Sequence, residues 1–222
     1  DNLNFIFKSV SIDGNLALEN IDALRGVTSP LNSISITENN KLLSIDGLIG
    51  IPELIRPPTG NSNLPYLGII ENEMLQNING LRGIEQVESH TRITIKESNN
   101  ITHLNGLENI RGTIGSLEIG FLPRLTNIQG VIGIDRLDGE LAILNCDALA
   151  NFNGLSNVSY IGSDIRFFFN DAVQNLDALS NLNEVDGSFQ IINNSLSDFC
   201  GLQNLFENGG VRSQFITEGN KF

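Results

Sequence analysis

The sequence has few of the residues that cross-link a chain or catalyse reactions. Of its 222 residues only two are cysteines and two are histidines, and tryptophan is absent. Two cysteines are too few for the disulfide framework of a small secreted domain. Neither His90 nor His103 stands at a recognised catalytic spacing from a nucleophile. The composition therefore disfavours a cross-linked scaffold and histidine-dependent catalysis.

Basic residues and long apolar runs are also scarce. Thirteen Lys and Arg stand against 26 Asp and Glu, so the net charge is −13, and the basic residues are scattered. Nucleic acids and anionic membranes bind clustered positive charge, so neither is expected as a partner. No apolar run approaches the roughly 18 residues of a membrane span. The first residues lack the pattern of a signal peptide, so we expect any targeting segment to be absent from this chain.

What the sequence does contain is a repeat of 24 residues, in which two apolar residues flank a single position. The leading pairs are Ile93/Ile95, Leu117/Ile119, Leu141/Ile143, Ile165/Phe167 and Phe189/Ile191. Such a pair is typical of a short strand with one face turned inward, and such a period is typical of a solenoid. The sequence predicts a mainly β protein, a right-handed β-solenoid of the leucine-rich-repeat kind. We expect about eight to nine coils in a single domain over residues 1–222.

The repeat is irregular at both ends and at one internal position. Residues 1–9 fit either the tail of a preceding coil or an N-terminal cap. Residues 56–66, which include three prolines, delay the next coil by nine residues and predict a loop insertion. Such an insertion is either a binding loop or a tolerated surface loop. Residues 201–222 predict a C-terminal cap, with a short amphipathic helix over 201–210 and one more coil starting at Phe215.

Two positions of the repeat carry residues that serve the scaffold. The inward asparagine position holds Asn15, Asn39, Asn72, Asn170 and Asn194, and Ser98, Leu122 and Cys146 interrupt it. An inward asparagine is expected to bridge backbone groups of adjacent coils. The glycine position holds Gly47, Gly80, Gly106, Gly130 and Gly154, with Ala23 and Ala178 as small substitutes. Glycine there predicts either a positive φ or a close approach of two coils.

The two cysteines are expected to be free thiols. Cys146 and Cys200 lie two coils apart at different positions of the repeat. Since coils stack at about 4.8 Å, that separation exceeds what a disulfide tolerates. Cys146 is most simply a small buried residue.

The pattern Leu-x-Ile-x-x-Asn-x-x-Leu-x-x-Ile-x-Gly-Leu, at Leu67 to Leu81, resembles the receptor L-domain type of leucine-rich solenoid. The resemblance covers nearly the whole chain, but only in scaffold residues. The long array, with Ser197-Asp198-Phe199-Cys200 and a trailing Asn220, is more similar to bacterial cell-surface (lipo)proteins than to growth-factor receptors. It implies an exported module, at the cell surface or anchored to the outer membrane, that binds a protein or glycan ligand without catalysis. It carries over no functional residue.

A carbohydrate-active enzyme is the alternative, because parallel β-helices include polysaccharide lyases and hydrolases. Such enzymes need paired carboxylates or a metal set in a cleft, and we expect neither here, nor a cofactor. The most suggestive acidic feature is a column of Glu38, Glu71 and Glu97 on three successive coils. Stacked carboxylates hold Ca²⁺, bind a cationic partner or, most often, are solvated surface. His103 stands where other coils have asparagine, so we expect a polar corner residue.

The outward side of the strands carries the candidate binding site. The fourth repeat position points outward and is apolar on three consecutive coils, at Leu144, Phe168 and Ile192. Phe121 and Phe169 lie beside them at the fifth position. Contiguous exposed apolar surface marks interaction sites, so we expect a strip that binds a partner or mediates self-association. The alternatives are that the C-terminal cap covers the strip, or that the twist of the coil half-buries it.

Overall fold

The structure is a computed structural model that describes residues 9–56 and 64–220. The expected tail or cap at residues 1–9 therefore lies outside the described residues except for Ser9, as does most of the expected insertion at 56–66. Of that insertion, Arg56 forms an ion pair of 3.0 Å with Glu88. Tyr66 is already the first residue of a strand and Pro65 is buried, so the coil resumes before the expected end of the loop.

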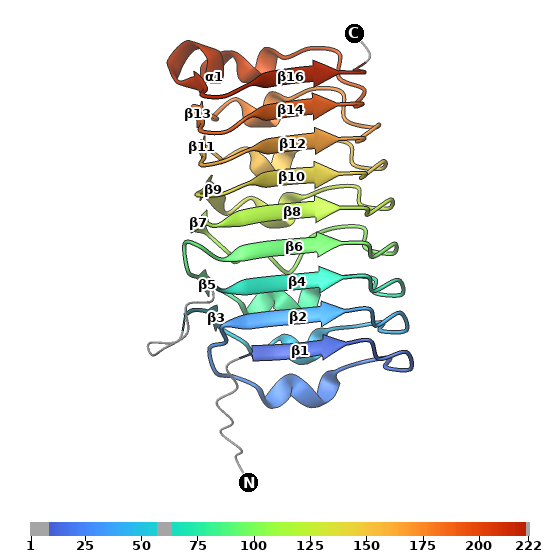
Figure 1. The fold of residues 1–222 in the computed structure, drawn as a ribbon. Helices are drawn as coiled ribbons and strands as arrows, with labels where there is room; N and C mark the ends of the chain where they lie inside the picture. The colour runs from blue at the N-terminus through green and yellow to red at the C-terminus, as the bar shows by residue number, and fades with distance from the viewer. Residues whose placement is uncertain (1–8, 57–63, 221–222) are drawn as a thin grey trace.

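Nine parallel strands form one continuous sheet along the molecule (Figure 1). They are β1 (Ser9–Asp13), β2 (Ser33–Thr37), β4 (Tyr66–Ile70), β6 (Arg92–Lys96), β8 (Ser116–Gly120), β10 (Leu141–Leu144), β12 (Ile165–Phe168), β14 (Phe189–Ile192) and β16 (Phe215–Glu218). The predicted apolar pairs lie opposite one another, as Ile143 pairs with Phe167 and Phe167 with Ile191. The predicted β-solenoid is thereby confirmed: each repeat is one coil, and each coil adds one strand.

The rest of each coil consists of shorter elements. A second parallel sheet contains β7 (Gly112–Ile114), β9 (Ile134–Leu137), β11 (Tyr160–Ile161), β13 (Glu184–Val185) and β15 (Gly210–Val211), and β3 (Glu53–Leu54) pairs with β5 (Gln86–Val87). The 3₁₀ helices are η1 (Asp22–Gly26), η2 (Asp46–Leu48), η3 (Asn79–Gly83), η4 (Gln129–Val131), η5 (Asn153–Leu155), η6 (Asp177–Leu179) and η7 (Cys200–Leu202). Consecutive 3₁₀ helices contact one another from coil to coil, except on either side of the coil that contains Gly106.

The C-terminal segment closely follows its prediction. The α-helix α1 (Gln203–Asn208) begins two residues later than expected, because η7 occupies the preceding turn. Strand β16 then pairs with β14 at Phe215 and Phe189, so one more coil does begin there. Asn220 extends the asparagine column, since its Oδ1 accepts the N–H of Asn194 at 3.0 Å.

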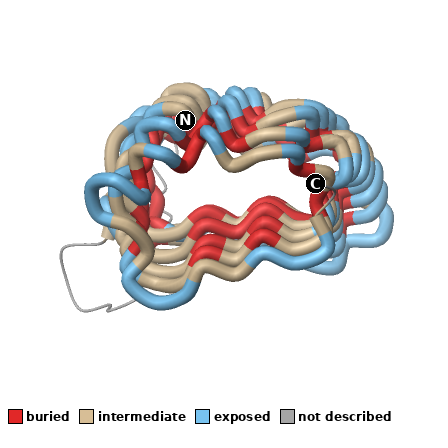
Figure 2. The backbone as a smooth tube through the Cα atoms, turned by 90° about the horizontal axis from the view of Figure 1, so that it is seen from above, coloured by how far each residue is buried: buried red, intermediate tan, exposed pale blue. Residues whose placement is uncertain are grey.

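The core is a continuous column of apolar side chains inside the coils. Viewed along the axis, buried residues line the inner side of each coil and exposed ones the corners (Figure 2). Phe152, Phe167 and Phe189 are fully buried, with ring centroids 4.3 Å and 5.6 Å apart in consecutive pairs. Leu18, in the first coil, is only partly buried, because no described coil stacks beneath it.

The asparagine column bridges the coils as expected. Asn170 donates through Nδ2 to the carbonyl of Ile143 (3.0 Å), and its Oδ1 accepts the N–H of Cys146 (3.2 Å). One expectation about this column was wrong: Ser98 does not interrupt it. The Ser98 hydroxyl accepts the N–H of Asn72 at 3.1 Å, because a hydroxyl oxygen can replace the amide oxygen there.

The glycine column is explained mainly by close approach of the coils. At Gly47, Gly80, Gly130 and Gly154 an added Cβ would overlap a carbonyl oxygen of the preceding coil. Of the expected glycine column, Gly106 alone has a positive φ, at +118°. Its coil has no 3₁₀ helix at the corner, whereas the coils on either side have one.

Candidate binding surfaces

The residue directly after each strand of the long sheet adopts a left-handed backbone conformation, with φ between 52° and 67°. These residues are Gly14, Glu38, Glu71, Glu97, Phe121, Asn145, Phe169, Asn193 and Gly219. Each of them except Gly219, which follows the last strand of the sheet, donates its N–H to the next coil, as when Phe169 donates to the carbonyl of Ile192 at 3.0 Å. Glycine and asparagine adopt this conformation easily, while other residues lose roughly 1–2 kcal/mol. The predicted glutamate column and the two flanking phenylalanines are thus parts of one corner column.

The apolar strip consists of Phe121, Leu144, Phe168, Phe169 and Ile192. Leu144, Phe168 and Ile192 are direct partners on adjacent strands, and each is half-buried. Phe168 points outward, since its neighbour Phe167 lies in the core. Phe121 and Phe169 are 46% and 44% exposed although they are large and apolar. Gly120 and Glu218 bound the half-buried row on either side.

The described part of the C-terminal segment does not cover this strip. Helix α1 contacts η7 and β15, and Figure 1 shows it beside the start of the long strands, whereas the strip lies at their ends. Leu144, Phe168 and Ile192 are half-buried, which agrees with that part of the expectation that the twist of the coil would half-bury the strip. The two flanking phenylalanines keep the strip open to solvent.

An acidic hollow of about 250 Å³ adjoins the strip. Its lining residues are Asn40, Glu71, Glu73, Glu97, Asn99 and Phe121, so Phe121 belongs to both surfaces. Glu71 and Glu73 from one coil and Glu97 from the next thus line the same hollow. Lys96 offsets part of this charge, with its Nζ 3.7 Å from Glu97 and 3.6 Å from Glu118. Among the described residues, no group of three or more His, Cys, Asp or Glu is arranged to hold a metal ion.

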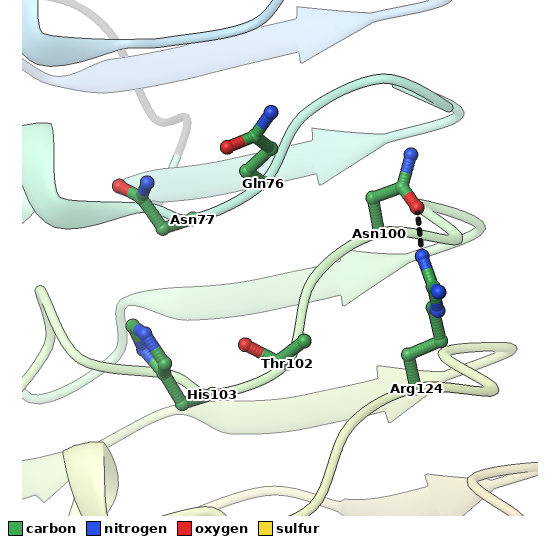
Figure 3. Close-up of a pocket in the computed structure, with 6 residues that line it drawn as sticks. All are labelled: Gln76, Asn77, Asn100, Thr102, His103 and Arg124. Atoms are coloured by element: carbon green, nitrogen blue, oxygen red, sulfur yellow. Dashed lines mark hydrogen bonds between the residues drawn. The ribbon is translucent and has the colours of Figure 1, made fainter.

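A second hollow, of about 430 Å³, lies around the corner on the next side of the coils. It is lined by Gln76, Asn77, Asn100, Thr102, His103 and Arg124, from three adjacent coils. Figure 3 shows Asn77 and His103 on one side and the hydrogen-bonded pair of Asn100 and Arg124 (2.7 Å) on the other, with Thr102 between them. The sequence interpretation missed this site. The available signal was Arg124, at a position that holds alanine in several other coils.

His103 is the polar corner residue that the sequence predicted. Its Nδ1 accepts the N–H of Asn105 at 3.3 Å, which matches the bond from Asn79 N–H to the side-chain oxygen of Asn77 one coil earlier. His90 lies elsewhere, 3.7 Å from a carboxylate oxygen of Asp138. The two histidines share no site.

The fold is a parallel β-solenoid in which each coil adds one strand to the long sheet. No family model and no curated protein matches the sequence. Among solved structures, the chain is similar to internalin C2 from Listeria monocytogenes, with 13% sequence identity and a TM-score of 0.49. The similarity covers 94% of this chain and 80% of that one. Identity at this level does not indicate a shared ligand. No helix within the described ranges is long and apolar enough to cross a bilayer.

Proposed function

We propose that the protein is a non-catalytic recognition module that binds a protein partner through the apolar strip. The observation that carries this proposal is the pair of exposed phenylalanines, Phe121 and Phe169, held in left-handed conformations beside three outward apolar side chains. A bulky residue in this conformation is rare and costs free energy. Asn145 and Asn193 fill the same position at lower cost, so the presence of phenylalanine there favours a role in binding. Aromatic side chains are common anchors at such surfaces.

The charge next to the strip indicates the chemistry of the partner. Glu71, Glu73 and Glu97 line the hollow that Phe121 closes, and Lys96 supplies one opposing charge. A lysine or arginine side chain in that hollow gains from the carboxylates and from the face of the Phe121 ring. The partner is therefore expected to present a basic residue followed by apolar ones. In this proposal the module is exported and held at the cell surface or anchored to the outer membrane, as the resemblance of its repeat implies.

The test is Phe168→Glu, which places a charge in the middle of the strip. Binding would be measured by probing an array of purified extracellular protein domains with the labelled chain, and self-association by sedimentation of the chain alone. We expect Phe168→Glu to weaken partner binding, or the association of a dimer, by more than about tenfold. Phe169→Asn should weaken it without loss of stability, because asparagine suits the left-handed corner.

Gln190→Glu is the matched control, since it adds the same charge at an outward position of the adjacent strand, outside the strip. Both charged variants should keep the circular dichroism and unfolding midpoint of the parent protein. If Phe168→Glu and Gln190→Glu behave alike, or if neither changes any interaction, the strip is ordinary surface and the proposal fails.

The rival function, hydrolysis or lyase cleavage of a polysaccharide, is supported by one observation, the three glutamates of the acidic hollow. Against it, this hollow of about 250 Å³ is smaller than the roughly 300–1,000 Å³ of typical ligand pockets. Release of new chain ends from a polysaccharide panel decides the matter. If the protein cleaves a polysaccharide and Glu71→Gln abolishes that cleavage, the protein is an enzyme and the proposed recognition function is wrong.

A further inference from the structure

The hollow of Figure 3 collects polar groups that have no hydrogen-bond partner among the described residues. Gln76 makes no hydrogen bond within the described residues, and neither does the hydroxyl of Thr102. Asn77 uses its oxygen to hold the N–H of Asn79, which leaves both N–H groups of its amide free. These groups come from adjacent coils and face one shared space (Figure 3). Gln76 and Thr102 are exposed and Asn77 is half-buried, so a single polar ligand can reach these donors and acceptors together.

His103 adds a donor whose proton is assigned by its hydrogen bond. Its Nδ1 accepts from Asn105 N–H, so the neutral ring carries its proton on Nε2. Its corner position also differs from the others: the coil lacks a 3₁₀ helix, and Gly106 has a φ of +118° there. The scaffold therefore departs from its regular course directly after His103, next to this hollow.

The charge of the hollow is opposite to that of the chain. The net charge of the protein is −13, yet none of the six lining residues is acidic. Arg124 has no ion pair among the described residues, and its hydrogen bond goes to the neutral oxygen of Asn100. Most other described basic side chains are paired with carboxylates, as Arg82 is with Glu108 at 3.1 Å. An unpaired guanidinium beside neutral donors suits a ligand with one carboxylate.

We propose that this hollow binds a saccharide that carries a carboxylate, such as a uronic acid. The carboxylate would pair with Arg124, and the sugar hydroxyls would exchange hydrogen bonds with Asn77, Thr102 and the Nε2–H of His103. No apolar side chain lines the hollow, so a peptide side chain has nothing to pack against. The volume of about 430 Å³ lies within the usual range for small-molecule sites. The proposal is independent of the apolar strip, which lies on another face.

The experiment is a titration of the ¹⁵N-labelled protein with glucuronate, glucose and inorganic phosphate, followed by NMR. Glucuronate should shift the amide signals of Asn77, Thr102 and His103 at millimolar concentrations and bind at least about tenfold more tightly than glucose or phosphate. Arg124→Gln should remove that preference, so that glucuronate and glucose bind alike. Thr102→Val should weaken both sugars, because it removes a hydroxyl and keeps the shape.

Lys41→Gln is the matched control, because Lys41 occupies the same repeat position three coils earlier and has no ion pair among the described residues. Lys41→Gln should leave glucuronate binding unchanged. Phe168→Glu should also leave it unchanged, because the apolar strip and this hollow are separate sites and the two proposals are tested independently. The proposal is overturned if glucuronate leaves these amide signals unmoved, or if Arg124→Gln and Lys41→Gln weaken its binding equally. Phosphate that binds as tightly as glucuronate would also contradict it, by reducing the site to a general anion contact.

Discussion

Among individual residues, the two cysteines differ most in their surroundings. Cys146 occupies the asparagine position and is fully buried, with its N–H bound to Asn170 at 3.2 Å. Burial raises the pKa of the Cys146 thiol to about 12. Cys200 is exposed, and a hydrogen bond with the Asp198 carboxylate raises its pKa. Both are free thiols, as the spacing of the coils predicts.

The raised pKa of Cys146 predicts a loss of stability in alkali. Above pH 9 the unfolded chain releases the thiol proton while the folded chain retains it until about pH 12. The free energy of unfolding should therefore fall by as much as about 1.4 kcal/mol per pH unit in that window from this group alone, and be unaffected below it. Urea unfolding at several pH values measures the slope. Cys146→Asn, which restores the usual residue of the asparagine column, should lose the part of this pH dependence that comes from the thiol. Cys200→Ala should keep nearly all of it. Identical slopes in all three proteins would contradict the prediction.

At the scale of the element, the corner after each long strand is held by two devices. The left-handed residue donates its N–H to the next coil, and where the following position holds asparagine, its side chain binds backbone groups of the preceding coil, as Asn170 does at Cys146 and Ile143. Together they satisfy backbone groups that the strand ladder leaves unpaired where the chain turns inward. Leu122 interrupts the asparagine column without disturbing the sheet, so an apolar side chain fits there.

Asn170→Leu tests what the asparagine contributes. Leucine fills the space, as Leu122 does, but it cannot accept the N–H of Cys146 or donate to the carbonyl of Ile143. Two buried unpaired groups should lower the free energy of unfolding by about 2–5 kcal/mol. Asn15→Leu, at the exposed first coil, should cost clearly less because water replaces the lost bonds. Chemical denaturation of both variants provides the comparison, and equal losses would show that the column is replaceable packing.

At the scale of the whole molecule, stability comes from stacking of coils on their neighbours. Most contacts link one coil to the next, and the core is one column of buried side chains along the axis. Interior coils are covered on both sides, while the first described coil leaves a hollow of about 600 Å³ at its open end. Leu18 and Leu24 line that hollow. A substitution should therefore cost more in the middle of the array than at its end.

Leu149→Ala and Leu18→Ala measure this difference at equivalent positions. Leu149 is fully buried between Leu125 and Val173, so its truncation should lower the free energy of unfolding by about 2–5 kcal/mol. Leu18 is already partly exposed, so the same change there should cost less than half as much. Urea unfolding of the two variants is the measurement. Equal losses would count against a stack of coils with nearest-neighbour stabilisation.

The sequence by itself determined the coil and its inside and outside. A fixed period with alternating apolar residues has one low-energy solution, in which equal positions stack, so strand register, buried core, asparagine column and outward strip all follow from spacing. Spacing also placed Phe168 outward and Asn220 in a further coil. These features depend on position along the chain, which a sequence records directly.

The tertiary structure decided what lies side by side around the corners. Gln76 and Thr102 share one repeat position on adjacent coils, whereas Arg124 occupies another position on a third coil, and the path of the backbone around the corner brings all three to one hollow. Glu71, Glu97 and Phe121 share one repeat position, so their stacking follows from spacing, but only the turn after the strand places them in one hollow with Glu73 and Asn99 from another position. The structure also showed why glycine is needed in the glycine column: adjacent coils approach so closely that a Cβ would overlap a carbonyl oxygen. Lateral distances depend on turn geometry and stacking, and a linear pattern of residues does not specify them.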